Sequence, residues 1–261
     1  MRGWSELYRT SLGLGVRHLR RHGYAREAVI RLVIPLDPSR YLELPWALEH
    51  LDASAGQTML DLASPKLLAV TLARRGVRVT TLDQLESEIE VWRRLAEGEP
   101  NLTFVVGDGR AMPFADASFD HGTSISVLEH IAGDGGDAAA LHELVRCVRP
   151  GGTIAITLPY APDAYIEYRK APAYVDHGER DDVGRVFFQR WYDDAAVQRL
   201  VSECAGLELV DSSIVRLQPN LSAAYIRTFP LLIPLGPAYG LLARERRGLG
   251  GDVVRLRFTR R

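Results

Sequence analysis

The sequence predicts an α/β fold built on a doubly wound, mostly parallel sheet, and two observations carry this prediction. From residue 57 onward, short apolar runs alternate with amphipathic stretches of helical period. This is the pattern of parallel strands joined by right-handed crossovers. In addition, three acids, Asp61, Asp83 and Asp108, stand at the ends of three consecutive strands. Because parallel strands end at the same edge of a sheet, we expect a ligand crevice there.

The first 56 residues are predicted to form a helical cap of two or three helices. Breaks are expected at Pro35 and at residues 37–39, where Asp, Pro and Ser follow one another. At the start of the chain, one stripe of apolar side chains is expected to pack on the domain. Its members are Trp4, Leu7, Tyr8, Leu12, Val16 and Leu19.

Residues 57–261 are predicted to form a Rossmann-like domain, whose last strand inserts antiparallel. Asp137 is a candidate N-cap, and residues 159–190 have too little periodicity to assign. The N-terminal helices and two insertions, at about 159–190 and 219–248, are expected to build a small-molecule pocket. The predicted strands are 57–62, 77–82, 102–107, 119–125, 153–158, 207–215 and 252–260, and the helices lie near 65–75, 84–97, 137–148 and 193–204.

Composition excludes several classes of protein. The net charge is −1, and no basic patch interleaved with aromatic residues favours nucleic acid. Cys147 and Cys204 give no disulfide framework and no zinc spacing. The N-terminus has no secretory pattern, so we expect a cytoplasmic protein. The apolar run 223–243 contains Arg227 and three prolines, and is expected to be a lid or a surface-lying segment without stable membrane insertion.

The turn after the first strand, "LDLASPK", lacks the glycines that nucleotide-binding turns usually carry. Ser64-Pro65 is a strong helix start, because Ser is a preferred N-cap and Pro suits the first helical position. A helix that begins this early would need no backbone of positive φ. Its free N–H groups are expected to receive a carboxylate, to which Lys66 adds a positive charge. The sequence lacks the G-x-G-x-x-G turn that is typical of a dinucleotide site, and it lacks the G-K-[ST] motif that is typical of a P-loop.

Four motifs together resemble the class I S-adenosylmethionine-dependent methyltransferases, of the small-molecule type 11 kind. They are "LDLASPK…VTTLD", "GDGRAMPFADASFD", "SISVLEHI" and "LVRCVRPGGTIAITLP", and they cover roughly residues 58–160. The resemblance implies seven strands in the order 3-2-1-4-5-7-6 and S-adenosyl-L-methionine as the cofactor. For Pro113-Phe114, a turn and a cofactor contact remain equal alternatives.

The resemblance also implies where the cofactor binds. Asp83 would hold the ribose, the Asp108-Gly109-Arg110 segment would meet the adenine, and Ser124 and Ile125 would lie beside the methionine portion. The full set of expected cofactor-binding residues is Asp61, Ala63, Ser64, Pro65, Lys66, Asp83, Gln84, Asp108, Gly109, Arg110, Ser124 and Ile125.

Methyl transfer from a sulfonium needs alignment of acceptor and methyl, and a base only where the acceptor must lose a proton. His130 and Tyr160 are the candidate catalytic residues, and packing roles are the alternatives. No metal is expected, although the acids and His177 at 176–182 leave a magnesium site conceivable. Arg190 and Tyr192 either bind an anionic acceptor or pair with nearby acids. A fairly apolar pocket is expected from Trp46, Tyr160, Tyr165, Phe187, Phe188, Tyr225 and Phe229.

The predicted function is S-adenosylmethionine-dependent methylation of a small, partly apolar acceptor, at oxygen and in secondary metabolism. One alternative is a protein of this fold that binds the cofactor without methyl transfer, either cyclase-like or a non-catalytic subunit. Another is a lipid or quinone methyltransferase at the membrane surface. The sequence indicates no oligomeric state.

Overall fold

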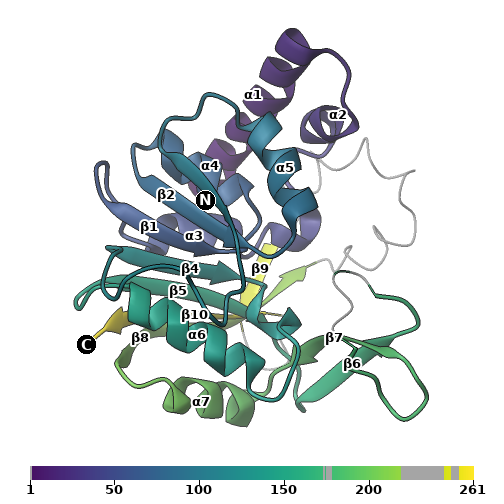
Figure 1. Cartoon of the computed structure of the whole chain (residues 1–261), viewed down its shortest axis with the longest axis vertical. Coiled ribbons are helices and arrows are strands. Elements are labelled where there is room, and N and C mark those ends of the chain that lie inside the picture. The colour runs from purple at the N-terminus through teal and green to yellow at the C-terminus, as the bar shows by residue number, and fades with distance from the viewer. Residues whose placement is uncertain (1, 173, 175–177, 219–243, 248–252) are drawn as a thin grey trace.

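An eight-stranded sheet with helices on both faces forms the body of the chain (Figure 1). The structure is a computed structural model that describes residues 2–172, 174, 178–218, 244–247 and 253–261. The strand order is β3-β2-β1-β4-β5-β10-β8-β9. The strands are β1 (Thr58–Leu62), β2 (Arg78–Asp83), β3 (Leu102–Val106), β4 (His121–Ile125), β5 (Thr153–Pro159), β8 (Leu207–Gln218), β9 (Arg244–Arg247) and β10 (Val253–Arg260).

The order confirms the predicted arrangement of seven strands and adds β9 at the edge beside β8. Strands β1 to β5 pair in parallel, and β10 lies antiparallel between β5 and β8. The central strand β1 is apolar on both faces, as a strand covered by two layers of helices requires. Met59 faces one core cluster, and Leu60 and Leu62 face the other.

The helices divide between the two faces according to these clusters. One layer holds α1 (Arg2–His22), α3 (Leu44–His50), α4 (Leu67–Arg74) and α5 (Glu86–Leu95), with α2 (Arg26–Val33) against α1. The other layer holds α6 (Gly136–Cys147) and α7 (Asp194–Glu203). Two short 3₁₀ helices, η1 (Pro38–Arg40) and η2 (Leu128–His130), lie near the carboxyl ends of the strands.

The cap helix α1 buries a different face from the one expected. Leu7 and Leu14 are fully buried and Thr10 and Ser11 nearly so, whereas Leu12 and Val16 are exposed. The predicted stripe was therefore wrong at Leu12 and Val16, whereas its other members pack on the core as expected, namely Trp4, Leu7, Tyr8 and Leu19. The polar residues are accommodated because Ser11 Oγ donates to the Arg31 carbonyl on α2, so the cap packs on itself as well as on the sheet.

A separate two-stranded sheet fills part of the segment that had no assignment. Strands β6 (Tyr165–Arg169) and β7 (Val186–Trp191) pair antiparallel. Arg190 donates to the carbonyl oxygens of Ile131 and Gly133, and the Tyr192 hydroxyl donates to Asp137. These two side chains therefore hold the small sheet against η2 and α6. Asp137 is not the N-cap of α6, because Gly135 takes that position with a φ of 67°.

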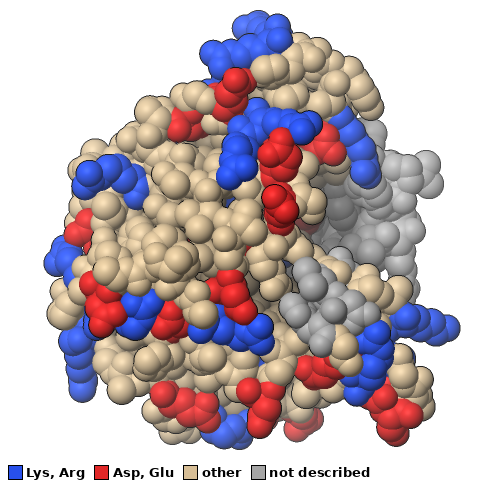
Figure 2. Space-filling view, in the orientation of Figure 1, with Lys and Arg blue, Asp and Glu red and all other residues tan. Residues whose placement is uncertain are grey.

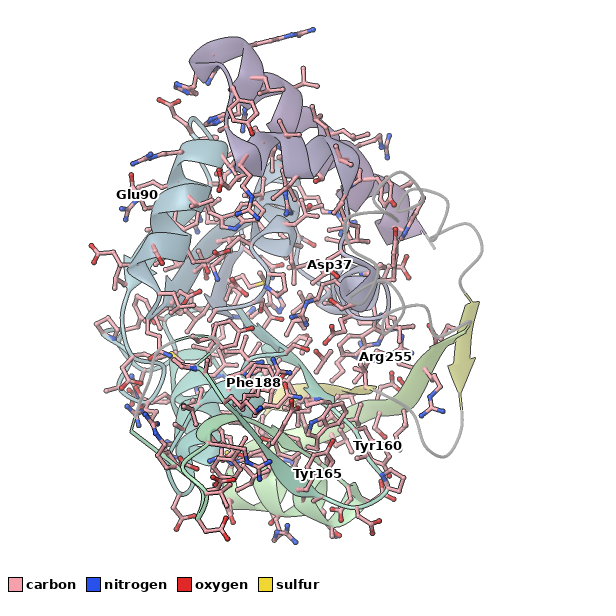
Figure 3. All side chains as sticks on the ribbon, turned by 90° about the vertical axis from the view of Figure 1, so that its right-hand side faces the viewer. Asp37, Glu90, Tyr160, Tyr165, Phe188 and Arg255 are labelled. Atoms are coloured by element: carbon pink, nitrogen blue, oxygen red, sulfur yellow. The ribbon has the colours of Figure 1, made fainter. Side chains whose placement is uncertain are left out.

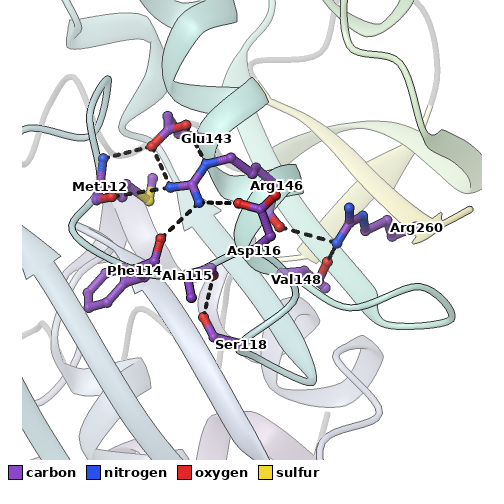
Figure 4. Close-up of polar contacts among 9 residues, drawn as sticks. All are labelled: Met112, Phe114, Ala115, Asp116, Ser118, Glu143, Arg146, Val148 and Arg260. Atoms are coloured by element: carbon purple, nitrogen blue, oxygen red, sulfur yellow. Dashed lines mark hydrogen bonds and ion pairs between the residues drawn. The ribbon is translucent and has the colours of Figure 1, made fainter.

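Arg146 on α6 fastens the loop between β3 and β4 (Figure 4). Its guanidinium donates to the carbonyl oxygens of Met112 and Phe114 and pairs with Asp116 and Glu143. The Phe114 ring packs edge-on against Phe119, with ring centroids 5.2 Å apart. The Pro113-Phe114 step is therefore a turn that leads into β4.

Positive and negative side chains are interspersed over the face drawn in Figure 2. Within the described part of the chain, no helix is both long and apolar enough to cross a bilayer. The predicted lid at 223–243, with Tyr225 and Phe229, lies outside the described residues.

We expect Arg146→Lys to lower the free energy of unfolding by about 1–3 kcal/mol, because a single ammonium cannot reach both carbonyl oxygens and both acids at once. Denaturant unfolding followed by circular dichroism measures this loss. Arg94→Lys is the matched control, since Arg94 makes an exposed pair with Glu90 on α5. Equal effects of the two substitutions would contradict the role given to Arg146.

Candidate cofactor and acceptor site

A cavity of about 740 Å³ opens at the carboxyl ends of β1, β2, β3 and β4. Its walls come from four parts of the chain: the strand-end loops, the cap, helix α5 and the small sheet. Asp37 from the cap and Phe188 from the small sheet, both labelled in Figure 3, belong to opposite walls. The cavity is therefore the crevice expected at this edge of the sheet.

The turn after β1 differs from the predicted early helix start. Helix α4 begins at Leu67, and Ala63 has a left-handed φ of 51°. The expectation that the turn needs no positive φ was therefore wrong. A residue other than glycine is strained in the left-handed region of φ. Ser64 does not cap the helix, because its Oγ accepts the backbone N–H of Ile125 on β4 at 2.9 Å. The turn is thus anchored to the neighbouring strand by a side chain.

Lys66 makes a buried ion pair with the strand-end acid of β2. Its Nζ lies 2.7 Å from Asp83 Oδ2 and 3.0 Å from the Ser64 carbonyl oxygen. The two side chains are only 2% and 6% exposed, yet both line the cavity. Asp83 Oδ1 also accepts the backbone N–H of Leu85 at 2.9 Å. The ammonium of Lys66 is therefore paired with Asp83 and does not provide a free positive charge at the N-terminus of α4.

The other two strand-end acids lie in contrasting surroundings. Asp61 is fully buried, accepts a hydrogen bond from Thr81 Oγ1 at 2.7 Å, and does not line the cavity. Burial raises its pKa, against the opposing effect of Lys66. Asp108 is 43% exposed and is gripped by the guanidinium of Arg110. Of the three acids, Asp83 and Asp108 therefore line the cavity, and Asp61 lies outside its wall.

The end of β4 meets the cavity two residues later than expected. Ser124 and Ile125 are fully buried and outside the wall, whereas Ser126 and Val127 line it. Ser126 has a φ of 52°, and its backbone N–H donates to the Thr157 carbonyl oxygen and hydroxyl. This backbone kink directs Ser126 into the cavity.

Glu43, at the start of α3, joins the cap to the sheet. Its Oε1 accepts from Ser126 Oγ and from Thr157 Oγ1, each at 2.5 Å, and its Oε2 accepts from Arg40 at 3.0 Å. Glu43 is 1% exposed. Sequence reasoning missed this residue, although an acid inside the apolar run "YLELPW" is a recognisable signal.

Glu129 is a second buried acid beside Glu43. It is 2% exposed, and burial, with a further contribution from the nearby Glu43, raises its pKa to about 8. Arg40 and Ser126 oppose this rise. Among the described residues, Glu129 Oε2 has no hydrogen-bond partner. Glu129 is therefore a neutral carboxylic acid at pH 7, next to the cavity wall.

His130 lines the cavity between the aromatic rings of Tyr174 and Phe188. Its Nδ1 lies 2.8 Å from the Phe188 carbonyl oxygen, which only accepts, so Nδ1 carries the proton. Burial lowers the pKa of the imidazole, which keeps it neutral. Nε2 therefore holds the free lone pair, 3.9 Å from Glu129 Oε1.

Tyr160 lies away from the cavity. Its hydroxyl donates to Asp194 on α7 at 3.0 Å, and its ring belongs to the core between β5 and that helix. Of the conceivable metal ligands, Glu179 accepts from Gly133 and Asp181 pairs with Arg185. Residues 176 and 177 lie outside the described residues. Within the described ranges, no group of three or more His, Cys, Asp or Glu could hold a metal ion.

The cavity wall thus contains most of the sequence-predicted site. The predicted residues on the wall are Ala63, Ser64, Pro65, Lys66, Asp83, Gln84, Asp108, Gly109, Arg110 and His130, whereas Asp61, Ser124, Ile125 and Tyr160 lie behind or away from it. Sequence reasoning missed the cap residues Arg31 and Arg40, which lie far along the chain from the motifs. Tyr174 was also missed, whereas Phe187 and Phe188 line the cavity as expected.

Comparison with known protein families gives a match to the part of the chain that forms the central strands. Residues 60–156 match the family described as a methyltransferase domain. A demethylmenaquinone methyltransferase of Beutenbergia cavernae is 35% identical over 120 residues, which cover 44% of this chain and 48% of the relative. An uncharacterised methyltransferase of Mycobacterium avium is 30% identical over 152 residues, covering 57% and 58%. The chain spans about half the length of these relatives.

Solved structures share the fold at low sequence identity. A putative methyltransferase from Bacillus halodurans C-125 superposes with a TM-score of 0.53 at 17% identity, over 85% of this chain and 98% of that one. Together with the matched domain, this confirms the predicted resemblance to class I S-adenosylmethionine-dependent methyltransferases.

We expect Glu129→Gln to remove a pH dependence of stability. In the folded chain Glu129 keeps its proton up to about pH 8, whereas an ordinary glutamate loses it near pH 4.5. The folded state therefore binds the extra proton, and the free energy of unfolding falls as pH rises between these values, by at most about 1.4 kcal/mol per unit. Chemical unfolding of both proteins at pH 5, 6.5 and 8 gives the difference. A difference that stays constant with pH would contradict a protonated Glu129.

Proposed function

We propose, because residues 60–156 match a methyltransferase domain and a solved methyltransferase structure shares the fold, that this chain is a class I S-adenosylmethionine-dependent enzyme that methylates a small, partly apolar acceptor. The observation that carries the proposal is the cavity at the carboxyl ends of the strands, with the buried Asp83 carboxylate in its wall. S-adenosyl-L-methionine supplies the electrophilic methyl group when bound.

The residues present fit this cofactor at two points. Asp83 keeps free lone pairs, since its carboxylate has about four acceptor positions and Lys66 and Leu85 occupy two. A ribose diol needs such an acceptor. The segment from Asp108 to Arg110 also lines the cavity and offers polar groups beside an adenine position. Both points support binding of a nucleoside at this end of the cavity.

The acceptor end is built from His130, Ser126, Arg40 and the aromatic rings of Phe187 and Phe188. A hydroxyl acceptor loses a proton as its oxygen takes the methyl group, and His130 Nε2 is the available lone pair to receive it. The Phe188 carbonyl holds the imidazole in the tautomer that this step needs. These features favour methylation at oxygen, and secondary metabolism is the setting that we propose for it.

A quinol-type ring is the second candidate acceptor. It is favoured by the names of several relatives, which are demethylmenaquinone methyltransferases. The aromatic wall of Tyr174, Phe187 and Phe188 would suit such a ring. An acceptor panel that includes phenols, carboxylic acids, amines and quinols distinguishes these candidates by the product that gains one methyl group. A protein that binds the cofactor and methylates nothing in the panel would favour the cyclase-like alternative.

We expect S-adenosylhomocysteine to bind the wild-type chain, and Asp83→Ala to weaken binding about tenfold to a hundredfold through loss of hydrogen bonds to a charged acceptor. Isothermal titration calorimetry measures both affinities. Glu90→Ala is the control, because Glu90 is exposed on α5 and does not line the cavity. No binding by the wild type, or an unchanged affinity in a folded Asp83→Ala variant, would refute the proposed cofactor site.

We expect His130→Ala to lower kcat about a hundredfold or more for a hydroxyl acceptor, while the affinity for S-adenosylhomocysteine stays within about threefold. Turnover with any acceptor identified by the panel, together with calorimetry, separates the two effects. His142→Ala on α6 is the control, since His142 does not line the cavity. Equal activity of His130→Ala and the wild type would exclude His130 as the base.

A further inference from the structure

Lys66 is an unusual residue for this chain. Of 32 lysines and arginines, only Lys66 and Lys170 are lysines. Lys170 is exposed, whereas Lys66 is among the largest fully enclosed side chains of the core. A guanidinium is larger and planar, so a compact ammonium is the cation that suits an enclosed position between a turn and a carboxylate. The presence of lysine at position 66 therefore indicates a specific role for the ammonium group in this turn.

The pair between Lys66 and Asp83 is expected to stay closed when a ligand binds. Both groups are almost fully buried, and separating a buried ion pair leaves two uncompensated charges. Removal of one partner from such a pair commonly costs about 3–5 kcal/mol. A ligand thus meets the pair intact, and it has to use the hydrogen-bonding capacity that remains.

The remaining capacity is that of a donor beside an acceptor. The ammonium has three N–H groups, and the described residues accept two of them, at the Ser64 carbonyl oxygen and at Asp83 Oδ2. Asp83 has lone pairs beyond those used by Lys66 and Leu85. Both residues line the cavity, and their side chains are 2% and 6% exposed. A hydroxyl group, which donates one hydrogen bond and accepts others, complements this pair.

We propose that Lys66 and Asp83 together recognise a ribose hydroxyl, which donates to Asp83 and accepts from Lys66. The inference rests on the proposed function, because it assigns a second recognition residue to the nucleoside end of the same cavity. It replaces the role predicted from the sequence, in which Lys66 meets the carboxylate of the cofactor. The chain would then recognise a ribose hydroxyl through a hydrogen-bond donor, the Lys66 ammonium, and through an acceptor, the Asp83 carboxylate.

The test is a thermodynamic cycle that compares the effect of removing the Lys66 side chain with the effect of removing a ligand hydroxyl on binding affinity. Calorimetry compares S-adenosylhomocysteine with its 2′-deoxy and 3′-deoxy analogues, on the wild type, Lys66→Met and Lys66→Gln. In the wild type, we expect loss of at least one hydroxyl to weaken binding about tenfold or more, as for hydrogen bonds to charged groups. In Lys66→Met, the penalty for that hydroxyl is expected to fall severalfold below the wild-type value, because the hydrogen bond from the ammonium is lost and the hydrogen bond to Asp83 remains. Lys170→Met, the matched control, is expected to keep the wild-type penalty.

The possible results of this test distinguish the role of Lys66 from the proposed function. Equal deoxy penalties in the wild type and Lys66→Met, for both hydroxyls, would overturn the role of Lys66 and leave the proposed function standing. A wild type that binds no S-adenosylhomocysteine would overturn the proposed function itself. If Lys66→Met does not melt cooperatively or binds too weakly to measure, Lys66→Gln decides. Its neutral amide is expected to reduce the penalty, and an unchanged penalty would overturn the inference.

Discussion

The structure depends on one constraint: ionisable groups that collect at the carboxyl edge of the sheet are buried, so each has to be paired within the chain or kept neutral. Glu43 meets this constraint between the cap and strands β4 and β5, and Lys66 meets it between the turn and β2. Glu129 meets it by keeping its proton. Each pairing also fixes a segment of backbone, so the electrostatic balance and the shape of the cavity are set by the same contacts.

The cap and the small sheet act on the site through single polar contacts. Glu43 reaches Ser126 from the cap, and the Phe188 carbonyl reaches His130 from β7. The parallel strands supply a floor whose geometry is common to this fold, whereas these two elements add the remaining groups of the cavity wall. The wall is therefore completed by segments distant along the chain from the strand-end motifs.

Periodicity predicted the seven strands, because β1, β2 and β5 are short apolar runs with clear limits, whereas the order of the strands came from the resemblance to a known family. Asp83 and His130 followed from their positions after strands. Glu43 and Arg40 were not predictable in this way, since their partners lie more than eighty residues away or in a separate element. The turn was misjudged for a related reason. Ser64 has the sequence of an N-cap, but a tertiary contact with Ile125 takes its hydroxyl.

The side-chain anchors of the turn at residues 63–66 also restrict the substitutions open to this chain over evolutionary time. Glycine at position 64 would leave the buried N–H of Ile125 without an acceptor, and glycine at position 66 would leave the Asp83 carboxylate alone. Position 63, where the backbone is already left-handed, accepts glycine without loss of a partner. A glycine-rich turn is thus reached only through less stable intermediates, so the present turn is entrenched by epistasis.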